Sequence, residues 1–379
     1  MTLTIPFNKA SVEGREIELV LAAIERGEIA GSAESAVAAV GILQEELAAK
    51  DVLLTTSCTA ALELVALLLD IKPGDVVIVP SFTFVSTAVA FVRSGAKIRF
   101  ADIDPVTLGI NVNHVAELLD DRVRAVIPVH YAGIAADVDQ LVELSHNNSF
   151  DIVEDNAHGL YGRLDNKPLG SFGRFSTLSF HETKNFTCGE GGALVVNRQS
   201  DVDRAHTLCD KGTNRRQFLT GTVDSYTWVD TGSSFRLSGL LAAFLLGQLE
   251  QRSPVLAKRG AVTEAYRERL APHSEELGFS CIPDLDNRLS PCHMFYVLLD
   301  SRQSRDRVLA ELRQAGIMAT FHYVPLHSSP GATRFADGNG DCPVTDEISG
   351  RLLRLPFFNS LTIDDIEIVV DRFLRAAKH

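Results

Sequence analysis

The sequence predicts an α/β fold with a mostly parallel central sheet, followed by a smaller α+β C-terminal domain. Short apolar segments alternate with helical segments between residues 52 and 196, which is typical of strands joined by crossover helices. Polar residues stand where several of these segments end, and the alternation stops near residue 250. We therefore expect a large domain over residues 1–250, with an N-terminal arm, and a small domain over residues 251–379.

Apolar periodicity predicts the elements of the large domain. A helix is expected over residues 16–26, before the first strand. Strands are expected at 52–55, 76–79, 98–100, 125–129, 151–153, 176–179 and 193–196. The helices between them are expected at 60–69, 85–93 and 138–145. Because ligands of parallel sheets bind at the carboxyl ends of the strands, we expect the functional site at that edge.

The C-terminal part has a different pattern. Helices are expected at 261–270, 307–315 and 363–375, and strands at 294–298 and 319–323. This mixture predicts a separate small sheet with helices packed against it.

Composition argues against several classes of partner. The chain has 36 Lys and Arg against 49 Asp and Glu, a net charge of −13, which disfavours nucleic acid and anionic membranes as partners. No apolar run is long enough to cross a membrane. The six cysteines form no CxxC pair, so we expect reduced thiols in a cytoplasmic protein and no metal site.

One lysine and one aspartate give the clearest chemical signal. Lys184 lies in the segment SFHETKN (179–185), after an apolar strand, and Asp155 ends another apolar strand 29 positions upstream. Pyridoxal phosphate (PLP) needs an amine to bind its aldehyde carbon and a carboxylate to keep its ring nitrogen protonated. The alternatives are a lysine that reaches solvent from a strand end, and an aspartate that caps a helix.

Other residues near the strand ends suit the rest of such a cofactor. The segment SCTAA (57–61) begins an apolar helix, and hydroxyls with free N–H groups at a helix N-terminus favour a phosphate. Ser179 adds a hydroxyl close to the lysine. Phe84 is placed to stack on a planar ring, and His158 to hydrogen-bond the cofactor's phenolic oxygen.

Each of these residues also has a structural interpretation. Ser57 or Thr59 would be an ordinary helix cap, Phe84 a core aromatic and His158 a structural histidine. His181 would orient cofactor or substrate, and spacing alone assigns it no role.

Seven stretches of the chain together resemble one known family. They are the segments 57–61, 72–75, 80–87, 128–133, 154–155, 179–185 and 321–327. In these stretches the sequence resembles the PLP-dependent nucleotide-sugar aminotransferases of the DegT/StrS type. The resemblance implies a PLP-dependent transferase type I fold, similar to aspartate aminotransferase, and a homodimer with active sites at the subunit interface. It implies L-glutamate and 2-oxoglutarate as one substrate pair, and a nucleotide-linked keto-sugar as the acceptor.

Matched position by position, the resemblance implies roles for individual residues. Lys184 would be the lysine that holds the cofactor, and Asp155 the partner of its ring nitrogen. His158 would lie near the ring oxygen, and Phe84 would stack on the ring. The implied phosphate contacts are Thr59, Ala60 and Ser179.

Finer variants in the sequence point to a substrate. The segments 6–8, 57–60, 180–185, 211–215, 226–228 and 232–234 most resemble members that convert dTDP-4-dehydro-6-deoxy-D-glucose to dTDP-4-amino-4,6-dideoxy-D-galactose for lipopolysaccharide or other surface polysaccharides. Candidate substrate contacts are His181, Arg215, Arg236, His322 and Tyr323. The alternative for the two arginines is that they are solvated surface charges in loops. Many relatives place an Asn of the partner subunit on the phosphate, in a segment where this chain has Ser234 and Arg236.

Other functions remain as alternatives. An aminotransferase for 3-keto nucleotide sugars would share all these motifs. A sugar 3-dehydratase of this fold has His in place of the catalytic lysine, and a non-catalytic PLP-fold regulator would lack Lys184 or Asp155. A nicotinamide dehydrogenase would need a Gly-rich fingerprint after its first strand, which is missing.

Overall fold

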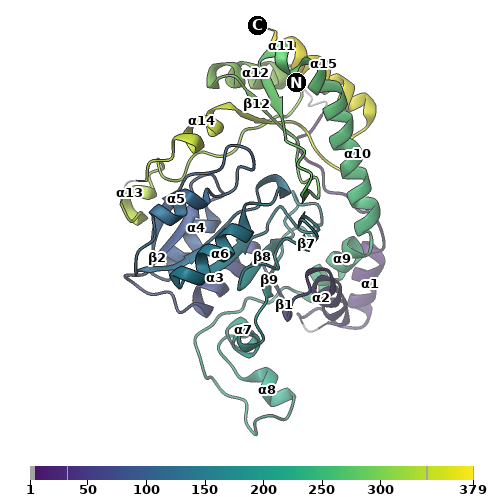
Figure 1. Ribbon diagram of the computed structural model, residues 1–379. Helices are drawn as coiled ribbons and strands as arrows, with labels where there is room; N and C mark the ends of the chain where they lie inside the picture. Colours follow the sequence, from purple (N-terminus) through teal and green to yellow (C-terminus); the bar gives the residue numbers. More distant parts are fainter. Residues whose placement is uncertain (1–4, 32, 339, 379) are drawn as a thin grey trace.

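A computed structural model describes residues 5–31, 33–338 and 340–378 (Figure 1). Its centre is a seven-stranded sheet in the order β1-β9-β8-β5-β4-β2-β3, in which only β9 runs antiparallel to its neighbours. The strands are β1 Asp51–Thr55, β2 Val76–Pro80, β3 Lys97–Ala101, β4 Val123–Val126, β5 Asp151–Asp155, β8 Phe175–Ser179 and β9 Gly192–Val196. The prediction of a mostly parallel sheet is confirmed.

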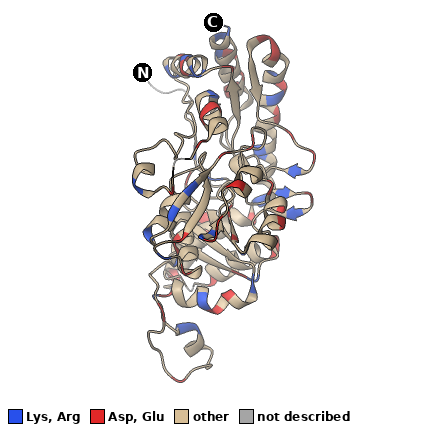
Figure 2. Ribbon diagram, turned by 60° about the vertical axis from the view of Figure 1, so that its left-hand side comes forward, with Lys and Arg blue, Asp and Glu red and all other residues tan. Residues whose placement is uncertain are grey.

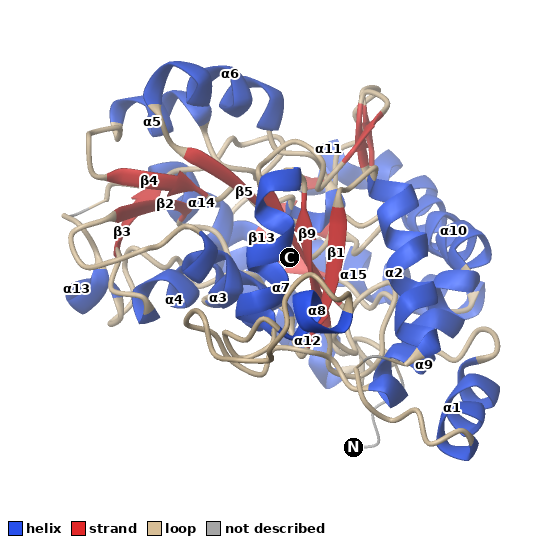
Figure 3. Ribbon diagram, turned by 90° about the horizontal axis from the view of Figure 1, so that it is seen from below, coloured by secondary structure: helices blue, strands red, loops and turns tan. Residues whose placement is uncertain are grey.

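Helices cover both faces of this sheet (Figures 1 and 3). One face packs against α3 Cys58–Leu68, α4 Ser86–Arg93 and α7 Val202–Cys209. The other face packs against α2 Glu34–Leu47, α5 Val112–Glu117, α6 Val138–Asn148 and α9 Gly239–Glu250, with α1 Glu16–Glu25 lying on α9. Strand periodicity explains the two layers, because Leu53 packs in the first core and Val52 and Leu54 pack in the second.

The C-terminal part forms its own small sheet at the top of Figure 1. The long helix α10 Arg252–Leu270 leads to it, and the antiparallel strand order is β10-β12-β13. These strands are Phe279–Cys281, Tyr296–Leu299 and Leu352–Arg354, covered by α12 Arg302–Gln314 and α15 Ile363–Ala377. Thr362 and Asp365 begin α15 with a reciprocal capping box.

Short elements complete the described chain. The short helices are α8 Arg215–Leu219, α11 Ser274–Leu277, α13 Ala332–Phe335 and α14 Pro343–Arg351, with 3-10 turns at Tyr131–Gly133, Gln199–Asp201 and Ala271–His273. A third sheet, β11-β6-β7, joins Arg288–Leu289 to Arg163–Leu164 and Lys167–Pro168. Because β11 returns to the N-terminal half, the two halves are tied together. The domain boundary near residue 250 therefore stays a prediction, although α10 begins close to it.

Two predicted strands are wrong in part or in whole. The strand expected at 125–129 ends at Val126, because Pro128 has no N–H to continue the ladder. The segment 319–323 forms no strand: only Thr320 pairs, by exchanging two backbone hydrogen bonds with Arg354. The partner of β12 is instead β13, whose three residues are too few to give a clear periodic signal.

The segment between α7 and α9, which contains α8, forms an arm that projects from the body at the bottom of Figure 1. Figure 2 shows that most of this arm is uncharged. Five of its large apolar side chains are exposed, among them Leu219 at 70% and Trp228 at 76%. An exposed apolar surface of this kind is typical of a contact with another protein chain.

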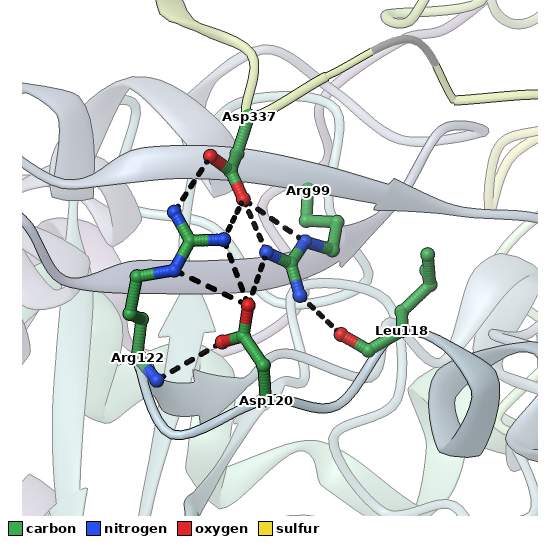
Figure 4. A network of polar contacts seen from close by, with 5 residues as sticks. All are labelled: Arg99, Leu118, Asp120, Arg122 and Asp337. Atoms are coloured by element: carbon green, nitrogen blue, oxygen red, sulfur yellow. Dashed lines mark hydrogen bonds and ion pairs between the residues drawn. The ribbon is translucent and has the colours of Figure 1, made fainter.

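Two arginines and two aspartates bind the loop after α13 to the main sheet (Figure 4). Asp337 accepts hydrogen bonds from Arg99 on β3 and from both Nη atoms of Arg122, the latter at 3.0 Å. Asp120 accepts from the same two arginines, at 2.9 and 2.7 Å. Although burial opposes the shift, hydrogen bonds from Arg122 and Arg99 lower the pKa of Asp120 to about 2. The pKa of Asp337 is lowered for the same reason.

Replacing Asp337 with asparagine is expected to lower the free energy of unfolding by about 1 kcal/mol at low salt. Since the pKa of Asp337 is depressed, this stabilisation is present at neutral pH and is lost as the pH falls below the usual pKa of an aspartate. High salt should shrink the difference between variant and wild type. Urea unfolding at low and high salt measures this difference in the free energy of unfolding.

The matched control is Asp371→Asn on α15. Asp371 pairs with Arg375 at 2.9 Å, but both side chains are more than half exposed, so no measurable change is expected. Equal effects of the two substitutions would contradict a special role for the four-residue network, which is less exposed than the Asp371–Arg375 pair.

No helix in the described ranges combines the length and apolar character needed to cross a membrane.

Candidate active site

A cavity of about 430 Å³ opens at the carboxyl edge of the central sheet. It brings together residues from the ends of β1, β5 and β8 and from the C-terminal part. Its lining includes Phe7, Ser57, Thr59, Phe84, Ser86, Thr87, Asp155, His158, Ser179, His181, Lys184, His322, Tyr323 and Arg354. The cavity thus lies at the edge of the sheet where the sequence predicts the functional site.

Lys184 lies in the loop that leaves β8, and this loop is anchored on both sides. Phe180 is fully buried and pairs with Gly191 through its backbone N–H, at 2.8 Å. Asn185 is buried on the other side, where it donates to the Pro291 carbonyl and contacts His293 Nδ1 at 2.8 Å. Burial lowers the pKa of Lys184 to about 8, although the Cys58 and Asp155 side chains oppose the shift. A substantial fraction of this amine is therefore neutral near pH 7.5.

Asp155 is the last residue of β5 and is 6% exposed. Its Oδ2 accepts a hydrogen bond from Thr87 at 2.8 Å, and its Oδ1 accepts one from the Ala157 N–H at 3.2 Å. Burial raises the pKa of Asp155, and these two hydrogen bonds and the Lys184 charge oppose that shift. The carboxylate is thus held in one orientation at the cavity wall.

The preceding residue, Glu154, anchors the same strand end on its other side. Its carboxylate is fully buried and accepts backbone N–H groups of Gly170, Phe172 and Gly173 at 2.7–2.8 Å. It also pairs with His130 Nε2 at 3.0 Å. Because His130 Nδ1 accepts from a backbone N–H, the proton of the neutral ring lies on Nε2 and is donated to Glu154. This network fixes the backbone that presents Asp155.

His158 forms one wall with a second histidine. Its ring stacks on His293 with centroids 4.2 Å apart. Burial lowers the pKa of both histidines well below the usual range, so both rings are neutral. His158 Nδ1 is buried and has no hydrogen-bond partner among the described residues.

Hydroxyl groups gather at the N-terminus of α3. Ser57 caps this helix by accepting the Ala60 N–H at 3.0 Å, so the Ala60 amide predicted to contact a phosphate is already bonded. The Thr59 and Ser86 hydroxyls lie 2.7 Å apart, and Ser179 lines the same cavity. Phosphate binding here would rest on hydroxyls and the remaining N–H groups of the first turn.

Aromatic side chains form the outer wall. Phe84 lines the cavity and is 59% exposed, so it is not the core aromatic of the structural alternative. Tyr323 stacks on His322 with centroids 4.1 Å apart, and its ring lies 6.5 Å from that of Phe84. The Tyr131 hydroxyl contacts His322 Nδ1 at 3.2 Å.

Not all predicted substrate contacts meet in this cavity. His181 lies at its rim, 41% exposed, and pairs with Glu190 at 3.6 Å. Arg215 and Arg236 line a different cavity of about 500 Å³, where they lie 3.7 and 3.4 Å from Asp210. Within one subunit, these two arginines are therefore separate from Lys184.

Sequence reasoning missed several residues of the cavity as individual contacts. Phe7, Ser86 and Thr87 belong to segments quoted for the family resemblance, but no role was assigned to them. Arg354 was missed altogether. Its signal is an arginine inside the apolar run LLRLP (352–356), where a charged residue needs a reason to be buried.

Residues 14–374 match the model of the DegT/DnrJ/EryC1/StrS aminotransferase family. The chain belongs to this family. Uncharacterized protein MJ1066 of Methanocaldococcus jannaschii is 28% identical over 323 residues, which are 83% of this chain and 83% of that protein.

Two solved structures show the same similarity. The aminotransferase TlmJ from Streptoalloteichus hindustanus is 26% identical, with a TM-score of 0.90 over 98% of both chains. A DegT DnrJ EryC1 StrS aminotransferase from Brucella abortus is 25% identical, with a TM-score of 0.84 over 95% of this chain and 94% of that one. The predicted aminotransferase fold is confirmed.

The family uses PLP, so this chain is a PLP-dependent aminotransferase. The cavity fits that cofactor. It offers an amine at Lys184, a carboxylate at Asp155 and, at His158, a buried nitrogen that has no hydrogen-bond partner in the part of the chain that the structure describes. Gly192 lets β9 pack closely against the start of α3, since a Cβ there would lie 2.3 Å from the Ser57 carbonyl carbon.

Proposed function

We propose that this enzyme transfers the amino group of L-glutamate to a nucleotide-linked keto-sugar. The proposed acceptor is dTDP-4-dehydro-6-deoxy-D-glucose, and the product is dTDP-4-amino-4,6-dideoxy-D-galactose. The observation that supports amino transfer most strongly is the meeting of Lys184 and Asp155 in one cavity at the strand ends. The choice of sugar rests on the sequence variants described above.

The proposed placement of the cofactor follows the chemistry of the lining. Lys184 would hold its aldehyde carbon, and Asp155 would keep its ring nitrogen protonated. His158 Nδ1 would bond the ring oxygen, and Phe84 would cover one face of the ring. The hydroxyls of Thr59 and Ser179 would bond the phosphate at the start of α3. Bound PLP supplies an electron sink for negative charge on the carbon that carries the amino group.

Lys184 also supplies the proton transfer. An amine with a pKa of about 8 is neutral often enough to accept a proton and acidic enough to return it. Lys184 Nζ would therefore remove the proton from the donor α-carbon and, in the second half of the reaction, deliver a proton to the sugar carbon. Because the amino group would stay on the enzyme while the keto acid leaves and before the sugar binds, we expect ping-pong kinetics.

We propose a homodimer with shared active sites. The exposed apolar arm around α8, with Leu219 and Trp228, supports a contact between two copies. Arg215 is the first residue of α8, and Arg236 lines the second cavity with it. Their proposed contacts with the sugar diphosphate would then be made in the partner's site, with Ser234 beside them.

The test is an amination assay. The purified enzyme is incubated with PLP, L-glutamate and dTDP-4-dehydro-6-deoxy-D-glucose, and NMR reads the position and configuration of the new amino group. A 4-amino galacto product is expected. A spectral change of the cofactor with glutamate but no sugar product would contradict the acceptor, and would move the search to 3-keto nucleotide sugars.

A further inference from the structure

His293 is a buried residue that connects two parts of the active site. It lies in the segment between β11 and β12, is 4% exposed and lines the cavity. Its Nδ1 lies 2.8 Å from the side-chain oxygen of Asn185, the residue that follows Lys184. Its ring stacks on His158, with centroids 4.2 Å apart and 21° between the planes. One imidazole therefore contacts both the loop of the proposed catalytic amine and the ring proposed to bond the cofactor.

The hydrogen bonds of Asn185 determine where the proton of His293 lies. The amide nitrogen of Asn185 donates to the Pro291 carbonyl at 2.7 Å, so the amide oxygen faces His293. Because an amide oxygen only accepts, His293 Nδ1 carries the proton and donates it. Burial is the main reason that the pKa of His293 lies well below its usual range, so the ring is neutral. The bond to Asn185 thus holds the His293 ring in one orientation.

The backbone of His293 is held independently of its imidazole. Arg259 of α10 donates from Nε to the Cys292 carbonyl at 2.9 Å, and from Nη2 to the His293 carbonyl at 2.6 Å. Cys292 has a φ of 52°, in the left-handed region that few residues with a side chain adopt. Such a conformation persists only where the surroundings enforce it. A change of the His293 side chain leaves these backbone contacts in place, so its effects report on the imidazole.

The ring of His158 depends on packing for its orientation. Its Nδ1 has no hydrogen-bond partner among the described residues. Tyr131 meets the ring edge-on, with centroids 5.8 Å apart. The contact with His293 is closer and nearly parallel, so it is the contact that fixes the plane of the His158 ring.

We propose that His293 is a positioning residue of the active site. Its ring, oriented by Asn185, holds the plane of His158 so that His158 can bond the phenolic oxygen of the cofactor. This inference rests on the proposed placement of His158 beside that oxygen, and it does not depend on the amino donor or the sugar.

The proposal has a consequence for the nitrogen that joins Lys184 to the cofactor. A hydrogen bond donated by His158 to the phenolic oxygen reduces the negative charge beside that nitrogen. The nitrogen then loses its proton at a lower pH. If the stack on His293 is lost, His158 can turn away, and the pH at which the nitrogen loses its proton should rise.

The first experiment titrates the visible absorbance of the PLP-loaded enzyme, with no donor and no sugar present. It gives the pH midpoint at which that nitrogen loses its proton. His293→Gln keeps an N–H for Asn185 but has no ring, and its midpoint is expected about 1 pH unit above that of the wild type. His293→Phe keeps a ring to stack but has no N–H, and its midpoint should rise by less than half as much. No rise in His293→Gln, or a larger rise in His293→Phe, would overturn the proposal.

The second experiment asks whether His293 acts through His158. The midpoint of His158→Leu should rise at least as far as that of His293→Gln. In the double variant the two rises should not add, because both substitutions remove the same hydrogen bond. Additive rises would contradict the proposal.

The His158→Leu variant also separates this inference from the proposed cofactor placement. A raised midpoint in His158→Leu with an unchanged one in His293→Gln would reject the role of His293 and keep the placement of His158. An unchanged midpoint in His158→Leu would reject both. The charged and titratable groups that act on Lys184 or His158 stay the same in all these variants; they are Cys58, Asp155, His322 and Arg354.

The matched control is Phe295→Leu. Phe295 is fully buried, lies two residues after His293 and stacks on Tyr266 with centroids 5.0 Å apart. It lies outside the cavity lining. The control should lose stability in thermal unfolding but keep the wild-type midpoint. Equal rises in Phe295→Leu and His293→Gln would mean that the midpoint follows a general loosening of the fold, and the positioning role would be wrong.

Discussion

Replacing Lys184 with alanine is expected to lower kcat by about 10⁴-fold or more. The substitution removes the amine proposed to hold the cofactor and to move the proton in both halves of the reaction. Among the described residues lining the cavity, Lys184 is the only primary amine. Steady-state amination rates, with product measured by NMR, give the effect. Added methylamine should restore part of the rate, because it supplies a base to the space that the side chain leaves.

The control for this prediction is Lys72→Ala. Lys72 is exposed in the turn before β2, far from the cavity lining, and the change should leave kcat within about 2-fold of wild type. Turnover close to wild type in Lys184→Ala would remove Lys184 from the chemistry.

The second large effect is expected for Asp155→Asn, with a loss of about 10³-fold in kcat. Asparagine fits the same space and keeps a contact with Thr87, but it has no negative charge to hold a proton on the ring nitrogen of the cofactor. The electron sink is then weakened. Single-turnover rates with L-glutamate measure this directly.

Asp151→Asn is the matched control, because Asp151 lies at the opposite end of the same strand. It pairs with Arg174 at 2.8 Å, so its loss should reduce stability rather than kcat. Comparable kcat values for Asp155→Asn and wild type would exclude the proposed pairing with the ring nitrogen.

The sheet was predictable because its strands are short, apolar and separated by helices. Seven strands were expected, and all seven occur within a few residues of their expected bounds. The prediction failed where pairing depends on residues far apart in the sequence. The segment 319–323 alternates like a strand, but β12 pairs with β13, and only Thr320 meets Arg354.

The residues of the site also differ in how far the sequence predicts them, for the same reason. Lys184 and Asp155 follow strands of one parallel sheet, so topology alone brings them to one edge. Phe7 and Arg354 reach the cavity from opposite ends of the chain and meet through a cation–π contact. No local pattern encodes that meeting. Arg215 and Arg236 were grouped with the site by similarity, and one subunit holds them in a second cavity.

The most direct test of the central claim follows one nitrogen atom through the enzyme. The PLP-loaded enzyme is first treated with ¹⁵N-labelled L-glutamate, freed of small molecules by gel filtration, and then mixed with dTDP-4-dehydro-6-deoxy-D-glucose. The account predicts one ¹⁵N per active site on carbon 4 of the sugar, with none in Lys184→Ala. An unlabelled product, or no transfer without glutamate present in the second step, would contradict amino transfer through the Lys184 cavity.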